Sequence, residues 1–315
     1  MTKRPIHARL SQSDIAIQIQ RLVQAIESHD TPAFRFKPTR SGFKLIERTR
    51  LSRYFDHIQQ MIDLFDEHYA YRYSEHLQAF WEACQDVGLE RSPRGPVCLD
   101  EEGTDYLDHY QSMNVLVARI RQLIREPRYL RRNDDHRYQA RQQETGIVDY
   151  VDSVLDRYSR SVVVRIDLFY LSVARARLRA EHVFDDLDRL MAERVRNPIF
   201  EHLTGYICAV EQGESRGYHI HAAFFFNGAE IRGDLYKAQQ IGELWEHITR
   251  GQGCFHSCNH DKARYGERCG VGTLRRNDRK ARDNVHQVVR YLVKDDQQLL
   301  LKPQGARCLR KGQVF

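Results

Sequence analysis

The spacing of apolar side chains divides the chain into a helical first part and a second part that contains strands. In the first part apolar residues recur every three or four positions, which is the period of one face of an α-helix. This spacing predicts helices at residues 13–26, 51–65, 77–87 and 106–124. Residues 31–44 carry prolines, a glycine and basic side chains, so we expect a loop there.

A β-branched run at residues 161–173, SVVVRIDLFYLSV, marks a change in the pattern and predicts a strand. We therefore place a domain boundary near residue 155. Residues 1–155 form a helical N-terminal region that is a candidate for DNA binding, and residues 156–315 form a second domain.

The second domain is predicted to alternate strands and helices. After the first strand the pattern indicates a helix at 178–195, a hairpin at 204–228, a helix at 234–248, strands near Cys254 and at 270–274, and a helix at 279–296. This order predicts an α+β fold with a largely antiparallel sheet and helices mainly on one face.

The hairpin carries a candidate metal site. His219 and His221 are two residues apart on the second strand, so their side chains share one face. A turn through the glycine-containing segment 213–217 would place Glu211 of the first strand beside them. Glu214 is an alternative third ligand, although it falls in the turn. A bare His-x-His also occurs by chance in a chain with 15 histidines.

The helix at 279–296 presents Tyr291 and Lys294 one turn apart on its polar side. A tyrosine hydroxyl has a pKa of about 10 and is a poor nucleophile until its target is polarised. A divalent cation on a phosphodiester and a lysine near the developing charge would supply that activation. The structural alternative is a tyrosine at the edge of the core and a lysine extended into water.

Together, the carboxylate, the His-x-His pair and the later Tyr-x-x-Lys resemble the HUH endonuclease superfamily. Within it the chain looks most like the rolling-circle replication initiators of inovirus-type filamentous phages and their prophage relatives. The resemblance covers about residues 160 to 300 and implies an HUH-type antiparallel sheet flanked by helices, with a ferredoxin- or RRM-like core. It implies that His219, His221 and Glu211 bind the metal, that Tyr291 is the nucleophile and that Lys294 assists it.

The resemblance also implies an activity. The tyrosine would nick single-stranded DNA with Mg²⁺ or Mn²⁺, leaving a 5′-phosphotyrosine link and a free 3′-hydroxyl from which rolling-circle replication begins. The expected partners are single-stranded or origin DNA and a host helicase and polymerase. One tyrosine at this position implies a single-tyrosine mechanism. The first strand matches the family loosely, and its Asp167 is either a competing ligand or a residue of the sheet edge.

Charge and composition favour a nucleic-acid partner. The net charge is +6, and no lysine occurs between Lys44 and Lys237, so arginine dominates. The base composition of the source genome would give the same bias. Arginines cluster between Arg119 and Arg141 together with Tyr129 and Tyr138, a composition typical of a DNA-contacting surface or, alternatively, of a solvated linker.

Cysteine usage and hydropathy bear on location. The seven cysteines are odd in number and scattered, and residues 1–10 have no apolar core, so we expect a reduced, cytoplasmic protein. The resemblance to phage and prophage initiators implies that the cytoplasm is that of a bacterial host. No apolar run has the length of a bilayer span, and we expect no membrane partner.

Two rival interpretations remain open at this point. Cys254, His256, Cys258 and His260 are zinc-type ligands, which suggests a non-catalytic, zinc-stabilised DNA-binding protein or regulator. A cupin-type dioxygenase also uses His-x-His with a carboxylate, but its glutamate follows the histidines closely, whereas AAFFFNGA follows them here. The ligands of the hairpin would by themselves also accept Zn²⁺.

Overall fold

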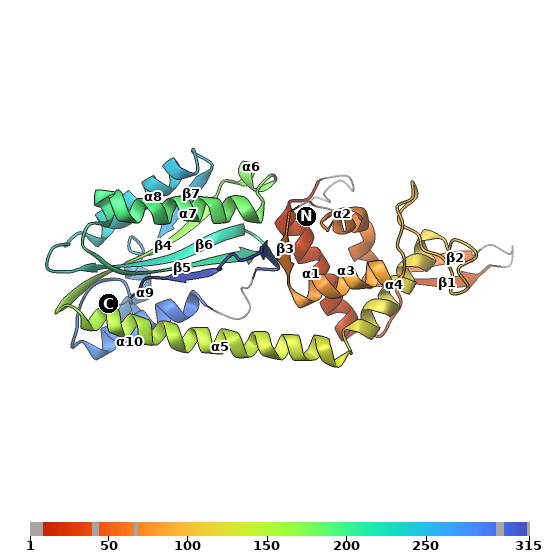
Figure 1. Cartoon of the computed structure of the whole chain (residues 1–315), viewed down its shortest axis with the longest axis horizontal. Coiled ribbons are helices and arrows are strands. Elements are labelled where there is room, and N and C mark those ends of the chain that lie inside the picture. The colour runs from red at the N-terminus through yellow and green to blue at the C-terminus, as the bar shows by residue number, and fades with distance from the viewer. Residues whose placement is uncertain (1–8, 40–43, 66–68, 294–298, 314–315) are drawn as a thin grey trace. The chain divides into compact units, whose positions relative to one another are not determined.

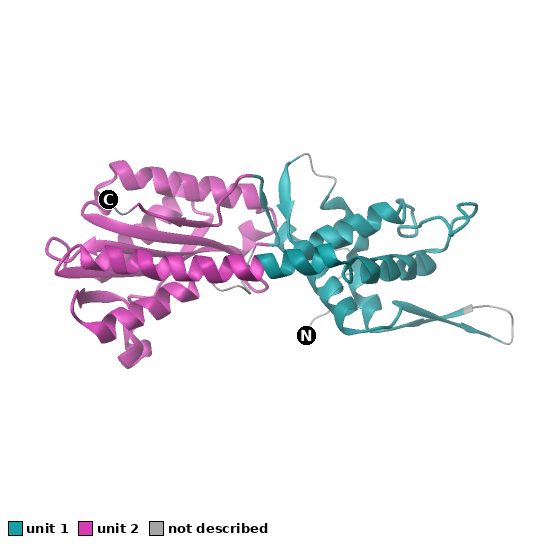
Figure 2. Cartoon of the chain, turned by 60° about the horizontal axis from the view of Figure 1, so that its bottom comes forward, with its two compact units in different colours: residues 1–135, 300–304 teal, residues 136–299, 305–315 magenta. Residues whose placement is uncertain are grey.

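The computed structural model describes residues 9–39, 44–65, 69–293 and 299–313, which divide into two compact units (Figure 2). Unit 1 comprises residues 1–135 and 300–304, and unit 2 comprises residues 136–299 and 305–315. The division falls inside one 30-residue helix, α5 (Pro127–Asp156), rather than at residue 155. Apolar side chains at opposite ends of this helix serve different cores: Tyr129 is buried in unit 1, and Val151 in unit 2.

Unit 1 is mainly helical, as the apolar spacing predicts. Its helices are α1 (Gln12–Ser28), the 3₁₀ helix η1 (Leu51–His57), α2 (Ile58–Asp63), α3 (Glu75–Asp86) and α4 (His109–Leu123). Ser11 caps α1, because its Oγ accepts a hydrogen bond from the backbone N–H of Asp14 at 3.1 Å. The helix buries Ile19, Leu22 and Ile26 at the spacing expected of one face.

The loop expected at residues 31–44 is wrong. Strands β1 (Phe34–Pro38) and β2 (Lys44–Arg48) form an antiparallel pair in this region, and residues 40–43 lie outside the described ranges. Phe34 is buried, and its ring centroid lies 4.9 Å from that of Tyr110 on α4. The alternation of apolar and polar residues in β1 is short, and the prolines and basic residues around it favoured the prediction of a loop. A second small sheet pairs β3 (Tyr71–Tyr73) with β9 (Leu301–Pro303), which comes from the far end of the chain.

Unit 2 contains one six-stranded antiparallel sheet. Its strands are β4 (Arg160–Tyr170), β5 (Leu203–Gly213), β6 (Gly217–Asn227), β7 (Gly253–Ser257), β8 (Gly272–Arg275) and β10 (Leu309–Lys311). The order is β10-β5-β6-β4-β7, and β8 also pairs with β4. The α+β class with antiparallel sheets and a helical N-terminal region is therefore confirmed. The sheet is open, which differs from the closed barrel of a cupin.

Helices cover both faces of this sheet, whereas the sequence indicated mainly one (Figure 1). The helices α7 (Ala180–Arg196) and α8 (Asp234–Ile248) lie on one face, and α10 (Arg279–Tyr291) and the second half of α5 lie on the other. The short elements are α6 (Ser172–Arg175), η2 (Pro198–Phe200), α9 (Lys262–Tyr265) and η3 (Gly266–Arg268).

The reason for the second helical layer lies in β6. Its two faces are both apolar over the second half of the strand: Phe224 packs against Phe200 on one side, and Phe225 joins the core under α5 and α10 on the other. Each face therefore needs a cover. In the described part of the chain no helix is both long enough and apolar enough to cross a bilayer.

Candidate metal centre

The register of the β5–β6 hairpin brings the predicted ligands together. Glu211 lies directly opposite His219, and Ala209 lies opposite His221. The three polar residues consequently point from the same face of the sheet. Glu214 is exposed in the turn between the strands, at residues 214–216, so Glu211 is the carboxylate that lies beside the histidines.

The side chains of Glu211, His219 and His221 form a buried group that could hold a metal ion. One carboxylate oxygen of Glu211, Oε2, lies 3.1 Å from Nε2 of His221 and 3.5 Å from Nε2 of His219. The three candidate ligand atoms all lie within 4.8 Å of one another, and each residue is at most 6% exposed. Two imidazoles and one carboxylate suit a divalent first-row cation, and they also accept Mg²⁺ or Zn²⁺.

The opposite ring nitrogen of each histidine is held by an acceptor. Nδ1 of His221 lies 2.5 Å from Oδ1 of Asp167 on β4, and Nδ1 of His219 lies 3.0 Å from the carbonyl oxygen of Gly217. Because a carbonyl and a carboxylate only accept, Nδ1 is a donor in both rings, and Nε2 is the nitrogen that faces Glu211. Asp167, which the sequence left as a competing ligand, therefore lies behind His221 and orients it.

The pKa shifts of this group favour a positive charge beside Glu211. Burial lowers the pKa of His221, but hydrogen bonds to Asp167 and Glu211 outweigh that effect and raise the pKa to about 8. Burial raises the pKa of the Glu211 carboxyl, and the hydrogen bonds from both histidines outweigh it, so the net pKa is lowered. A proton on the imidazole of His221 supplies this positive charge, and a bound cation would supply it instead.

The predicted nucleophile lies beside this group. Tyr291 is the last residue of α10, and its ring centroid is 5.7 Å from that of His221 with the planes 70° apart. The tyrosine is 38% exposed, so a substrate has access to it from solvent. Lys294, the predicted helper, lies outside the described residues.

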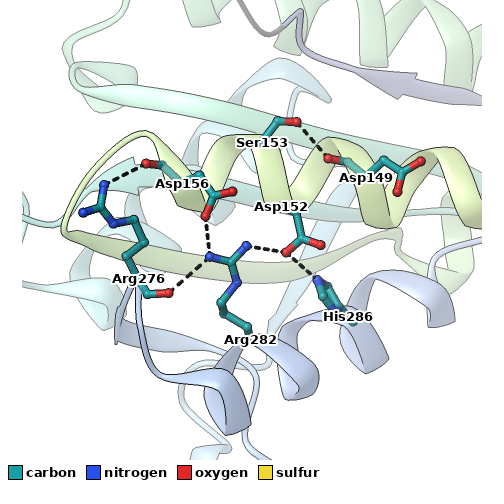
Figure 3. A network of polar contacts seen from close by, with 7 residues as sticks. All are labelled: Asp149, Asp152, Ser153, Asp156, Arg276, Arg282 and His286. Carbon is teal, nitrogen blue, oxygen red and sulfur yellow. Dashed lines mark hydrogen bonds and ion pairs between the residues drawn. The ribbon is translucent and has the colours of Figure 1, made fainter.

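A polar network holds α10 against α5 and thereby positions Tyr291 (Figure 3). The guanidinium of Arg282 donates to Asp152 and to Asp156, both at 2.5 Å, and Nε2 of His286 lies 3.0 Å from Asp152. Arg276 donates to the backbone oxygen of Asp156 at 3.2 Å. Val285, Val289 and Leu292 of the same segment are buried in the core with residues of α5. The last residue of α10 is thus supported by contacts along the whole helix.

Arg282→Ala is expected to weaken this attachment. The free energy of unfolding should fall by about 1–2 kcal/mol, because two carboxylates lose a charged donor at a partly buried site. Urea denaturation measures the loss. Arg279→Ala is the matched control, since Arg279 is exposed at the start of the same helix. Equal destabilisation by both changes would show that the network does not hold α10.

Sequence reasoning missed Arg165, which lies beside both Tyr291 and Asp167. Its Cζ is 4.9 Å from the ring centroid of Tyr291, and Nη2 is 3.6 Å from Oδ1 of Asp167. Nε of Arg165 is buried and has no hydrogen-bond partner within the described residues. A single arginine inside the apolar run VVVRI was the available signal, because a charge in a buried strand is uncommon.

The side chain of Asn259 supports the strand at Arg165. β4 pairs with β8 up to Val163 and with β7 from Ile166 onward, which leaves a gap between these strands. Asn259 fills that gap: Oδ1 accepts from the N–H of Arg165 at 2.8 Å, and Nδ2 donates to the carbonyl of Val163 at 2.9 Å and to Asp234 at 2.7 Å.

The zinc-type residues at 254–260 do not converge in the structure. Nε2 of His256 lies 3.3 Å from Asp261, Nδ1 of His260 lies 2.8 Å from Ser257, and Cys258 is buried. Among the described residues, the one set of three or more such side chains with suitably close ligand atoms is Glu211, His219 and His221. Zinc at 254–260 therefore receives no support from the geometry.

The basic segment 119–141 is partly neutralised within unit 1. Arg119 pairs with Asp86, Arg121 with Asp30, and Arg128 with Glu82, at 2.7–3.0 Å. The hydroxyl of Tyr129 donates to Glu27 at 2.6 Å, and this tyrosine is buried, whereas Tyr138 is 64% exposed. Tyr129 consequently is not a platform for stacking bases.

The fold and the site define an α+β domain with a buried Glu-His-His group next to a tyrosine. Residues 126–253 match the family model described as the YagK/YfjJ C-terminal domain. The match is less than half of the chain; it includes the Glu-His-His group, Asp167 and Arg165, and it ends before Tyr291. Comparison with curated proteins and with solved structures gives no match.

Proposed function

We propose that the chain is a metal-dependent endonuclease of the HUH type that nicks single-stranded DNA through a tyrosine and so initiates rolling-circle replication of a phage or prophage element. One observation carries the proposal: Tyr291 lies against His221 of a buried Glu-His-His group, and Arg165 lies over its ring. A tyrosine with access to solvent, beside a candidate cation site and an arginine, suits transfer of a phosphoryl group.

The chemical step needs no further reactant. Oη of Tyr291 attacks the scissile phosphorus, an O–P bond forms to the tyrosine, and the bond from phosphorus to the 3′ oxygen breaks. The phenol loses one proton and the 3′ oxygen gains one, so the products are a 5′-phosphotyrosine and a free 3′-hydroxyl. A divalent cation, which we propose is Mg²⁺ or Mn²⁺, would polarise the phosphate when bound to His219, His221 and Glu211.

Within this proposal the surrounding residues have distinct roles. Asp167 holds the ring of His221 in the orientation that presents Nε2, and Arg165 offers its guanidinium to the scissile phosphate. Lys294 would assist the tyrosine, as the resemblance implies. We place the reaction in the cytoplasm of a bacterial host, where a host helicase and polymerase would extend the 3′ end.

Arg165→Ala is expected to slow formation of the covalent adduct by about 10²-fold, the usual effect of removing one donor from a developing negative charge. Mn²⁺ affinity should change little, because Arg165 is not a ligand. Arg165→Lys should recover part of the rate, and Arg160→Ala, an exposed arginine of the same strand, should retain all of it. An unchanged adduct rate in Arg165→Ala would remove Arg165 from the mechanism.

A labelled-strand assay tests the proposed function. The wild-type chain is incubated with single strands that cover both strands of the source replicon, with Mg²⁺ or Mn²⁺ or with EDTA. A 3′-end label should become covalently attached to the protein, whereas a 5′-end label should appear on a shortened free strand. Trypsin cuts after Arg290 and Lys294, so the peptide 291–294 should carry the nucleotide mass. No adduct on any strand, or an adduct on another peptide, would contradict the proposal.

A further inference from the structure

A groove in unit 1 lies between α1 and the start of η1. Its volume is 870 Å³, within the range of ligand-binding sites. The lining includes Gln18, Arg21 and Gln24 from α1 and Arg50, Arg53 and Tyr54 from the segment around η1. All of these residues belong to unit 1, and the groove is separate from the Glu-His-His group of unit 2.

The groove is positively charged. Among the residues that the structure describes, three arginines line it and no aspartate or glutamate does. Arg50 and Arg53 have no carboxylate partner in the ranges that the structure describes, and both are exposed. Two acids close in sequence to the lining have other partners: Asp56 pairs with Arg48 at 2.6 Å, and Asp30 pairs with Arg121 at 3.0 Å. Guanidinium groups without acidic partners favour an anionic ligand.

An aromatic side chain lies beside these charges. Cζ of Arg53 is 4.8 Å from the ring centroid of Tyr54, and Nη2 donates to the tyrosine hydroxyl at 2.8 Å. The guanidinium holds the half-buried ring in place at the edge of the groove. Gln18 and Gln24 add amide groups that both donate and accept. Each kind of side chain suits one part of a nucleotide: the arginines suit the phosphate, the tyrosine ring suits stacking of the base, and the glutamine amides suit hydrogen bonds to the base edge.

From this combination we propose that the groove is a binding site for single-stranded DNA. Arg21, Arg50 and Arg53 contact phosphates, and a base stacks on Tyr54. A concave site of this size admits unstacked bases one after another, which an intact duplex does not offer. The proposal assigns a DNA contact to unit 1 that does not involve the metal group, and it does not depend on the nicking activity.

Equilibrium binding in EDTA tests the site while the metal group is inactive. The full chain is titrated against a fluorescein-labelled oligo(dT) of about 12 nucleotides, a length within the range of single-strand sites. Arg50→Ala/Arg53→Ala should weaken binding on the order of tenfold or more and should reduce the slope of log K against log salt by about 1 to 2. Arg50→Lys/Arg53→Lys should retain most of the affinity.

The matched control is Arg35→Ala/Arg94→Ala, which removes two exposed arginines of unit 1 outside the groove. It should bind the oligonucleotide like the wild type. If it loses as much affinity as Arg50→Ala/Arg53→Ala, binding follows net charge and the groove proposal is wrong. Retained affinity in Arg50→Ala/Arg53→Ala also overturns it. Circular dichroism confirms that each variant is folded.

Variants of Tyr54 distinguish a site for nucleic acid from a site that binds any polyanion. Tyr54→Ala should weaken oligo(dT) binding about tenfold through loss of stacking, whereas Tyr54→Phe should bind like the wild type. Inorganic polyphosphate, which has no bases, should bind equally to all three proteins. If Tyr54→Ala binds oligo(dT) normally, or if it loses polyphosphate to the same degree, no base stacks on this ring and the proposal fails. Because EDTA is present throughout, a missing nicking activity would not change these results.

Discussion

Replacing Tyr291 with phenylalanine is expected to eliminate the covalent protein–DNA adduct. The change removes one atom, Oη, and keeps the ring that contacts His221 and lies beneath Arg165. Loss of a nucleophile lowers the rate on the order of 10⁴-fold or more, so no adduct should appear on a denaturing gel with 3′-labelled DNA. Metal affinity should be unchanged, because the ligand atoms of Glu211, His219 and His221 remain in place.

Tyr265 provides the sharpest control for this result. The charges of Arg165 and Asp167 influence the pKa of its hydroxyl, so it is a second tyrosine worth testing. Burial, together with a hydrogen bond to Cys258, raises the pKa of its hydroxyl to about 12, which makes it a poor nucleophile at neutral pH. Tyr265→Phe should form the adduct at the wild-type rate. The reverse pattern, with loss in Tyr265→Phe and retention in Tyr291→Phe, would assign the nucleophile to Tyr265.

The sequence was sufficient to predict the hairpin that carries the Glu-His-His group. The two-residue period of a strand places His219 and His221 on one face, and the short turn leaves few registers in which Glu211 can face them. The observed pairing of Glu211 with His219 is one of these. The helices with strong apolar stripes, such as 234–248, also appear at the predicted positions.

Features that depend on partners distant in sequence were not predictable. The pair β3–β9 joins residues near 72 to residues near 302, and neither segment shows a strong strand pattern by itself. The roles of Arg165 and Asp167 depend on which strand lies beside β6, and hence on sheet order rather than on local spacing. Helix α5 was missed because its polar, arginine-rich first half masks the apolar spacing, and propensity in such a segment is a weak guide.

The sequence of β6 supports two interpretations, a strand covered by helices on one face or on both faces. The sequence AAFFF in β6 is a continuous apolar run, which is typical of a strand buried on both sides. The sequence pattern places both histidines on one face of this strand and predicts helices mainly on one face of the sheet. In the structure that face is polar at His219 and His221, whereas Ala223 and Phe225 farther along it are buried in the core with residues of α5 and α10. The metal group thus lies at the margin of a hydrophobic core, which accounts for its burial.

Glu211→Gln is expected to weaken divalent-cation binding about 10- to 100-fold, because the amide keeps the shape of the side chain and removes its charge. Isothermal titration with Mn²⁺ measures the affinity. Glu214→Gln, which changes an exposed glutamate in the turn of the same hairpin, should bind Mn²⁺ like the wild type. Normal binding by Glu211→Gln together with loss in Glu214→Gln would show that the turn residue is the third ligand.

Asp167, which contacts the far side of the His221 ring, gives a further test of the metal site. Asp167→Asn should lower Mn²⁺ affinity about 10- to 100-fold without removing a ligand, because Asp167 holds the ring of His221 in its metal-facing orientation.

Mn²⁺ at about 100 times its dissociation constant should raise the unfolding free energy of the wild type by about 2.7 kcal/mol. His219→Ala/His221→Ala should show no such increase, since it removes both imidazoles. A full increase in this double variant would place the cation elsewhere and would leave Tyr291 without the activation that the proposed reaction requires.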